Sequence, residues 1–122
     1  MAVATNDAVL SDEALEMMAM RFRALADPNR LRLVILLMQR EITVGDLAQR
    51  TGLDQPNISR HLAVLRRNGI VSRRSEGKRA YYRVSEPTVV DLCRVMCQGL
   101  AEKLAGDLQA LPDIDAWKGM NI

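Results

Sequence analysis

Residues 43–69 read TVGDLAQRTGLDQPNISRHLAVLRRNG, and they contain the start and stop signals of two short helices. Thr43 and Asp46 are three positions apart just before an apolar residue, which resembles the capping box at a helix N-terminus. Gly52 is of the residue type that most often follows the end of a helix. We therefore predict a first short helix that ends at about Thr51.

A second helix is predicted to begin at Asp54 or Gln55 and to run to Asn68, with Gly69 as its stop. Pro56 fits this helix only in the first turn, where its missing N–H is not needed. Because residues 52–54 alone separate the two helices, the stretch predicts a helix-turn-helix.

The second helix of this motif has one apolar face and one polar face. Ile58, Leu62 and Leu65 recur at helical spacing and are expected to pack on the core. Recognition helices place their N-terminal end against base edges in the major groove, where Gln and Asn pair with adenine and Arg pairs with guanine. Surface exposure alone would explain any one polar side chain here, but not the whole group. The members of this group are Gln55, Asn57, Ser59, Arg60 and His61.

Three residues of this helix are expected to act differently from the base readers. Arg66 and Arg67 lie farther along the helix and are expected to contact phosphates, which position a protein without reading sequence. His61 lies beside the apolar face, so we expect it to contact a phosphate or the protein scaffold. Metal ligation is the least favoured role for His61.

The next segment predicts a basic β-hairpin. Residues 70–75 and 79–84 are strand-like, and residues 76–78 form a tight connection that contains glycine. From Gln55 to Arg83 there are eight basic residues and one acidic residue, a net charge of +7, whereas the rest of the chain carries −5 of the total of +2. A solvated face is the alternative for a charge run alone, but such a concentration is typical of a polyanion site. The hairpin residues expected to contact DNA are Arg73, Lys78 and Arg79.

Helices are also predicted on both sides of this unit. Residues 11–25 show an amphipathic pattern, residues 28–38 follow the capping signal of Asp27 and Pro28, and residues 41–43 are a candidate short strand. Ser85 and Pro87 are predicted to start a long final helix that runs to about Ala110. Its apolar stripe consists of Val89, Leu92, Met96, Leu100, Leu104 and Leu108. This order of elements predicts a mainly α fold with a small β-hairpin wing, a winged helix-turn-helix.

The length of 122 residues suits a single domain, with a core from about residue 11 to 110 and a loose tail at 111–122. Because so short a chain buries a small core, the apolar stripes of the first and last helices predict a homodimer. No apolar run approaches the roughly 18 residues that span a membrane. The N-terminus also lacks the pattern of a secretory signal. We expect a cytoplasmic protein with no membrane contact.

The chain resembles the ArsR/SmtB family of bacterial repressors, many of which sense metals. The matching stretches are residues 26–33 (ADPNRLRL), 54–62 (DQPNISRHL), 68–71 (NGIV), 76–79 (EGKR) and Tyr81-Tyr82. The resemblance extends over most of the chain, from about Met17 to Leu108. It implies a homodimer paired through the first and last helices, and an imperfect palindromic operator in double-stranded DNA near its own promoter. It also implies that an inducer releases the DNA.

The chain departs from the metal sites of that family. Some members carry a Cys-x-Cys pair in the first helix of the motif, where this chain has residues 43–46 (TVGD). Others carry a site on the last helix made of Asp, two His and Glu. Here Asp91 matches the first position, but Cys93 and Leu104 replace the two histidines. The resemblance therefore supplies no complete metal site and no certain cofactor.

Cys93 and Cys97 are the only cysteines, and their spacing of four places them on one face of the last helix. Three roles remain open for them: packing as small apolar side chains, sensing oxidants or sulfur species through thiolates, and binding a thiophilic metal or metalloid. A disulfide within the helix is disfavoured, because Cβ atoms at this spacing are about 5–6 Å apart and a disulfide needs about 3.8 Å.

These patterns favour a sequence-specific DNA-binding transcriptional regulator that acts as a repressor. An enzyme is disfavoured, because the sequence has no Gly-rich phosphate loop and His61 is its only histidine. The remaining alternative is a dimeric winged-helix module that no longer binds DNA. Such a module would be expected to have lost the polar recognition surface that residues 55–67 retain.

Overall fold

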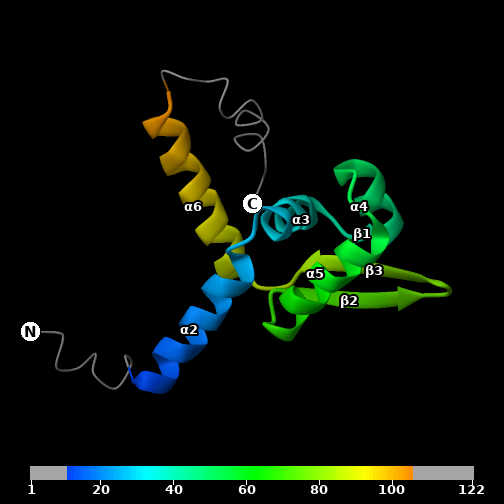
Figure 1. Cartoon of the computed structure of the whole chain (residues 1–122), viewed down its shortest axis with the longest axis horizontal. Helices are drawn as coiled ribbons and strands as arrows, with labels where there is room; N and C mark the ends of the chain where they lie inside the picture. The colour runs from blue at the N-terminus through cyan, green and yellow to red at the C-terminus, as the bar shows by residue number, and fades with distance from the viewer. Residues whose placement is uncertain (1–10, 106–122) are drawn as a thin grey trace, which may run out of the picture.

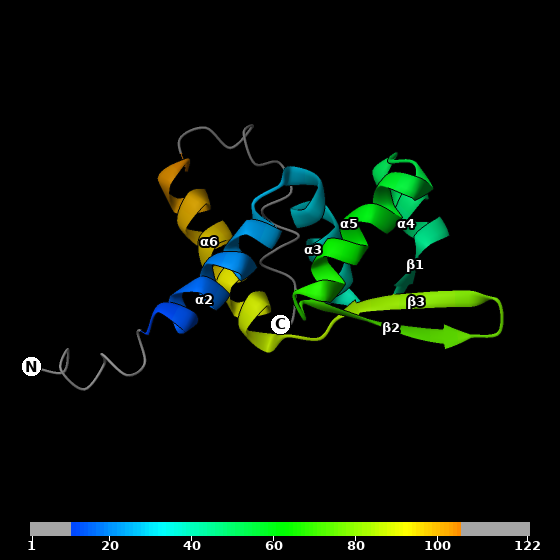
Figure 2. The same cartoon turned by 60° about the horizontal axis from the view of Figure 1, so that its bottom comes forward.

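The computed structural model describes residues 11–105, which form five helices and a three-stranded antiparallel sheet. Helices α2 (Asp12–Leu25) and α6 (Pro87–Lys103) lie on one side of the molecule. The hairpin and the helix-turn-helix lie on the opposite side, and the tip of the hairpin extends away from the body (Figures 1 and 2). The predicted mainly α winged helix-turn-helix is confirmed.

The helices begin where the sequence places their capping residues. The Ser11 hydroxyl accepts a hydrogen bond from the Ala14 amide at 3.2 Å, at the start of α2. Helix α3 (Pro28–Gln39) starts at Asp27, whose carboxylate accepts from the amides of Asn29 and Arg30 at 2.9 and 3.0 Å. These caps satisfy amide groups that have no partner inside the helix.

The core lies beneath the helix-turn-helix. Helices α4 (Val44–Thr51) and α5 (Gln55–Arg67) pack with α3, and the predicted face of α5 is fully buried. The buried apolar side chains are Ala24, Leu25, Leu33, Val34, Leu37, Ile42, Leu47, Ile58, Leu62, Leu65, Ile70, Val71 and Val89. Only Val89 of this set belongs to α6, so α6 is a marginal contributor to the core of a single chain.

The sheet contains one strand more than the hairpin. Strands β2 (Val71–Glu76) and β3 (Arg79–Val84) pair antiparallel, and Gly77 takes the positive φ of 62° that their tight turn requires. The short strand β1 (Ile42–Thr43) pairs with the other edge of β3, which gives the order β1-β3-β2. The hairpin is thereby attached directly to the segment that starts α4.

One predicted boundary is wrong: α6 ends at Lys103, whereas its apolar stripe predicted a helix to about Ala110. Leu104 and Ala105 form a turn, with the Ala105 amide donating to the Glu102 carbonyl. A helix is stabilised mainly by packing of its apolar face, and this end of α6 has little to pack on, since Leu100 is 44% exposed. Leu108 and the predicted tail lie outside the described residues. No helix between residues 11 and 105 is long and apolar enough to cross a membrane.

Candidate nucleic-acid interface

Helix α5 is fixed at its start by one side chain. The Asp54 carboxylate accepts a hydrogen bond from the Asn57 amide at 2.8 Å, and Gly52 ends α4 with a φ of 76°. Because this turn fixes the start of α5 and one face of α5 is buried, the opposite face points outward. Gln55, Ser59 and Arg60 are exposed there, and Asn57 is partly exposed.

The outward side chains of α5 also bond to one another. The Arg60 guanidinium donates to the Asn57 amide oxygen, and the Asn57 amide group donates to the Asp54 carboxylate at 3.3 Å. The three residues form a chain of hydrogen bonds along the first turns of the helix. The polar groups at the start of α5 are therefore oriented by their neighbours.

A groove separates the start of α5 from the wing, and it brings residues from both elements together. Its volume is about 890 Å³, and α4, the start of α5 and the hairpin form its walls. The sequence-predicted residues that line it are Gln55, Ser59, Arg73, Lys78 and Arg79. The other predicted residues, Asn57, Arg60, His61, Arg66 and Arg67, lie on α5 outside its lining. Arg66 and Arg67 are exposed in the last turn of that helix.

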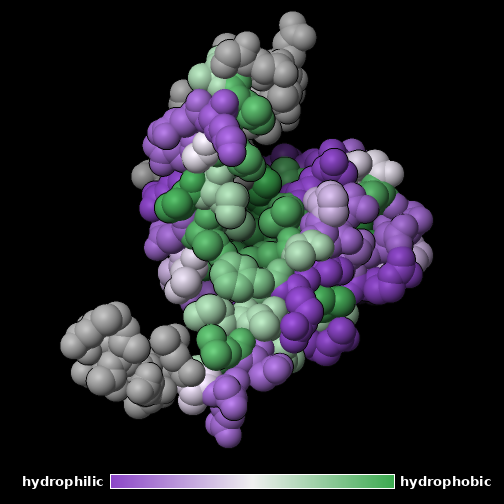
Figure 3. All heavy atoms as spheres, turned by 60° about the vertical axis from the view of Figure 1, so that its left-hand side comes forward, coloured by the Kyte–Doolittle hydropathy of each residue, from purple (hydrophilic) through white to green (hydrophobic). Residues whose placement is uncertain are grey.

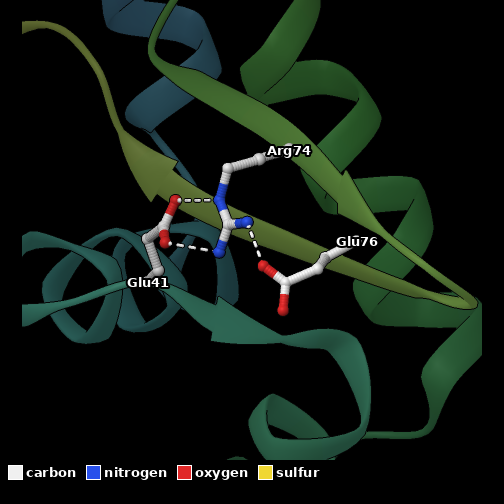
Figure 4. A network of polar contacts seen from close by, with 3 residues as sticks. All are labelled: Glu41, Arg74 and Glu76. Atoms are coloured by element: carbon white, nitrogen blue, oxygen red, sulfur yellow. Dashed lines mark hydrogen bonds and ion pairs between the residues drawn. The ribbon is translucent and has the colours of Figure 1, made fainter.

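Arg74 has a different environment from the other basic residues of the wing. Its guanidinium donates twice to the Glu41 carboxylate, at 3.2 and 3.0 Å, and once to Glu76 at 2.6 Å (Figure 4). It also lies 4.8 Å from the centre of the Tyr81 ring. The bonds to Arg74 lower the pKa of the Glu41 carboxyl group. The two carboxylates thus balance the positive charge of Arg74. The ion pair with Glu41 connects β2 to the residue before β1.

His61 faces the body of the protein rather than the groove. Its Nδ1 atom lies 3.4 Å from Nη1 of Arg30, and the same guanidinium donates through Nε to the Ala24 carbonyl at 2.6 Å. Of the two roles that the sequence predicts for His61, this geometry favours the contact with the protein scaffold.

The two cysteines lie far from this groove along the chain, in an apolar cleft between α2, α3 and α6. The cleft has a volume of about 500 Å³, and both thiols contribute to its walls beside Phe22, Leu25 and Ile35. Burial raises the pKa of both thiols. Among residues 11–105, no group of three or more His, Cys, Asp or Glu could hold a metal ion.

Sequence reasoning missed two residues with a place at or near the interface. Gln49 of α4 lines the groove beside the predicted residues, and its position on the exposed face of an amphipathic helix is the signal that could have found it. Arg30 lies on α3 and contacts α5 only through the tertiary fold. No local pattern indicates that contact.

Comparisons with known proteins identify the family of this chain. The model of the arsR family of bacterial regulatory proteins matches residues 27–73. An uncharacterized helix-turn-helix transcriptional regulator of Mycobacterium tuberculosis H37Rv is 35% identical over 107 residues, which cover 87% of this chain and 94% of the relative. The chain belongs to the arsR family. The family assignment confirms the prediction of a DNA-binding transcriptional regulator and disagrees with an enzymatic function.

This arsR-family regulator is also similar to a named repressor and to a solved homodimeric domain. A probable mercury resistance operon repressor of Streptomyces lividans is 44% identical over 92 residues, covering 75% of this chain and 70% of the relative. The solution structure of a homodimeric winged helix-turn-helix DNA-binding domain from Mycobacterium bovis, a possible ArsR-family regulator, is 34% identical. It aligns with a TM-score of 0.67 over 76% of this chain and 88% of that domain.

Proposed function

We propose that this arsR-family regulator is a homodimeric repressor that binds an imperfect palindromic operator and leaves it when an inducer binds. The observation that carries the proposal is the groove in which Gln55 and Ser59 of α5 lie with Arg73, Lys78 and Arg79 of the wing. Polar side chains that can read bases lie on one wall, and cations lie on the facing wall. This arrangement suits one strand of duplex DNA, which has bases on one side and phosphates on the other.

The residues divide into two kinds by their chemistry. The proposed base readers are exposed or half-exposed near the start of α5, and they are Gln55, Asn57, Ser59 and Arg60. The proposed phosphate contacts are cations farther from that end, and they are Arg66, Arg67, Arg73, Lys78 and Arg79. The start of a helix suits base reading because recognition helices enter the major groove with that end.

A homodimer is supported by the apolar side chains that a single chain leaves uncovered. They gather over α2 and α6, around a hollow between α2, α3 and α6 (Figure 3). The large exposed ones on the two helices are Leu15, Met17, Met18, Met20, Phe22, Val95, Met96 and Leu100. Soluble monomers rarely expose a contiguous apolar patch of this kind, and the M. bovis domain is itself homodimeric.

We further propose a single domain over residues 1–122 that functions in the cytoplasm, where the operator DNA of a bacterium lies. Residues 11–105 support this organisation, because one core connects α2 to α6. Repression is the mode of regulation proposed here, since the S. lividans relative is named as a probable repressor.

We propose that the inducer site involves the apolar cleft. Three roles stay open for the two cysteines in that cleft: packing, thiol sensing and metal binding. The raised pKa of Cys93 and Cys97 favours packing, because the thiolate is the form that reacts and binds metals. The mercury-resistance relative favours a soft metal or metalloid. The two thiols would bind such a thiophilic ion only as thiolates, and they lie on one face of α6.

A double variant distinguishes these roles. Operator binding by the parent and by Cys93→Ala/Cys97→Ala is measured with and without zinc, a thiophilic metalloid, a polysulfide or peroxide. Release of the parent but not of the double variant identifies the sensing chemistry. If the parent ignores every reagent, or the double variant responds as the parent does, the cysteines pack and the inducer binds elsewhere.

The proposed function is tested by selection from random duplexes. We expect the protein to enrich an imperfect palindrome with half-sites about one helical turn apart. The logarithm of the affinity for this palindrome should fall linearly with the logarithm of the salt concentration, because DNA phosphates release counterions when the protein neutralises them. Enrichment of no sequence above the random pool would reject the proposal.

A further inference from the structure

Arg30 connects the end of α2, the start of α3 and the recognition helix α5. We propose that Arg30 and His61 are positioning residues, which hold α5 at a fixed angle to α2 and do not contact DNA. The inference rests on the proposed function, because it concerns how the operator is read.

The contacts of Arg30 reach two elements other than its own helix. Nε donates to the Ala24 carbonyl at 2.6 Å, and Nη2 donates to the Arg23 carbonyl at 3.2 Å. Both carbonyls belong to the last turn of α2, at the negative end of the helix dipole, and the Arg23 carbonyl also accepts from the Ala26 amide at 3.2 Å. A guanidinium group, with donors in a fixed planar arrangement, suits such a site.

The remaining nitrogen of the guanidinium faces α5. Nη1 lies 3.4 Å from Nδ1 of His61, and since arginine can only donate, a hydrogen bond between them requires Nδ1 without a proton. Asp27 lies between α2 and α3. Its carboxylate accepts a 3.0 Å hydrogen bond from the Arg30 amide, which fixes the backbone of Arg30. The side chains of Arg30 and His61 are half-buried. The recognition helix is therefore joined to the α2–α3 corner by a defined polar contact as well as by apolar packing.

His61 also determines which way its neighbour points. Adjacent residues on an α-helix are rotated by about 100°, so a helix that turns His61 toward Arg30 turns Arg60 outward. Arg60 is exposed and is one of the proposed base readers. Loss of the Arg30 contact would let α5 rotate or tilt, and the base readers would move with it.

The angle matters for the whole operator because α2 carries the proposed dimer surface. In a dimer, the orientation of α5 relative to α2 sets the separation of the two recognition helices. That separation has to match half-sites about 34 Å apart, or one turn of DNA. A loosened α5 would therefore bind with lower affinity and with weaker preference for the correct spacing.

The alternative is that His61 contacts a phosphate, and the salt dependence of binding separates the two roles. Loss of a phosphate contact made by a charged imidazole reduces the slope of log K against log salt by about 1, and loss of any single phosphate contact leaves the spacing preference unchanged. Loss of a positioning contact lowers affinity at every salt concentration and leaves the slope unchanged. A lower stability of the fold alone would not change the preference for one half-site spacing.

The experiment uses the full chain and the selected operator, with two further duplexes whose centre is longer or shorter by one base pair. The variants are His61→Ala, Arg30→Gln and their combination. His61→Gln keeps an oxygen that can accept from Arg30. Arg32→Gln is the matched control, because among residues 11–105 Arg32 donates only within α3, to Asn29. Circular dichroism and sedimentation establish that each variant is folded and dimeric.

We expect His61→Ala and Arg30→Gln to weaken operator binding by about tenfold each. The double variant should be no weaker than Arg30→Gln, since the two residues act through one contact. All variants should keep the parent salt slope, and the two single variants should discriminate less among spacings. His61→Gln should retain more affinity than His61→Ala, and Arg32→Gln should behave as the parent.

Other results would overturn the proposal. They are a salt slope reduced by about 1 in His61→Ala, additive losses in the double variant, an unchanged spacing preference, or parental affinity in His61→Ala. If Arg30→Gln does not fold, the salt slope and the spacing preference of His61→Ala and His61→Gln still decide between a positioning role and a phosphate contact. Failure of the parent itself to bind any selected duplex would reject the proposed function, which is a distinct result.

Discussion

At the residue scale, neighbouring basic side chains of this protein have different tasks. Arg73 lines the groove and is exposed, whereas Arg74 beside it is held by two carboxylates and a tyrosine ring. Arg60 is exposed on α5 and bonds to Asn57. Net charge alone would count these arginines as equal, but their partners separate the candidates for DNA contact from a structural ion pair.

Replacing Arg60 is expected to change specificity, and replacing Arg79 is expected to change affinity alone. Arg60→Ala should cost about 1–3 kcal/mol on the selected operator and relax the preference at one base pair in each half-site. Arg79→Ala should weaken all sequences alike and reduce the salt slope by about 1. Titrations on operator and random duplexes measure both effects. Equal losses on the two duplexes for both variants would show that Arg60 does not read a base.

At the element scale, capping and attachment keep the recognition helix and the wing in place. Helix α5 depends on Asp54 for its first turn, and the wing is attached to the body through β1 and through Arg74. Each attachment involves few atoms, so single substitutions test it.

Removal of the α5 cap should destabilise the fold. Asp54→Ala leaves the Asn57 amide without its acceptor, which should cost about 0.5–2 kcal/mol. Denaturant titration measures this loss, and Asp54→Asn is the control, because asparagine is an equally good capping residue. Equal stability of parent and Asp54→Ala would mean that water replaces the carboxylate at no cost.

The attachment of the wing should depend on pH through Glu41. Arg74 lowers the pKa of the Glu41 carboxyl in the folded state. The stabilisation from this pair is therefore complete above the pKa of the unfolded state, and it is lost as the pH falls through the lowered folded value. Glu41→Gln should be less stable than the parent at pH 7, and the two proteins should converge in acid. A stability difference that is constant with pH would contradict this assignment.

At the scale of the whole molecule, the core lies in the winged helix-turn-helix, and most of α2 and α6 lies outside it. Only Val89 of α6 is buried, while Met96 and Leu100 are 62% and 44% exposed. The missing contacts are the reason to expect a second subunit, and the two-fold arrangement of the subunits would give the operator its palindromic symmetry.

A charge on this surface should separate the subunits. Met18→Glu or Leu100→Glu places a carboxylate in the proposed interface without a partner, which should weaken the dimer by about 2 kcal/mol or more. Sedimentation measures the monomer fraction, and operator binding should fall with it. Gln98→Glu is the matched control, since Gln98 is exposed on the other side of α6. A parent protein that sediments as a stable monomer at micromolar concentration would contradict the dimer.

The sequence by itself determined the local elements and their order. Capping residues, Gly52, Gly77 and apolar periodicity are signals between positions a few residues apart, and they predicted the helix-turn-helix, the wing and the buried face of α5. Only the tertiary structure decided the pairing of β1 with β3, the Arg74–Glu41 ion pair and the Arg30–His61 contact. These contacts join residues some thirty or more positions apart, which become neighbours only when the core has formed. A polar side chain that faces a partner across the fold has the same local pattern as one that faces water.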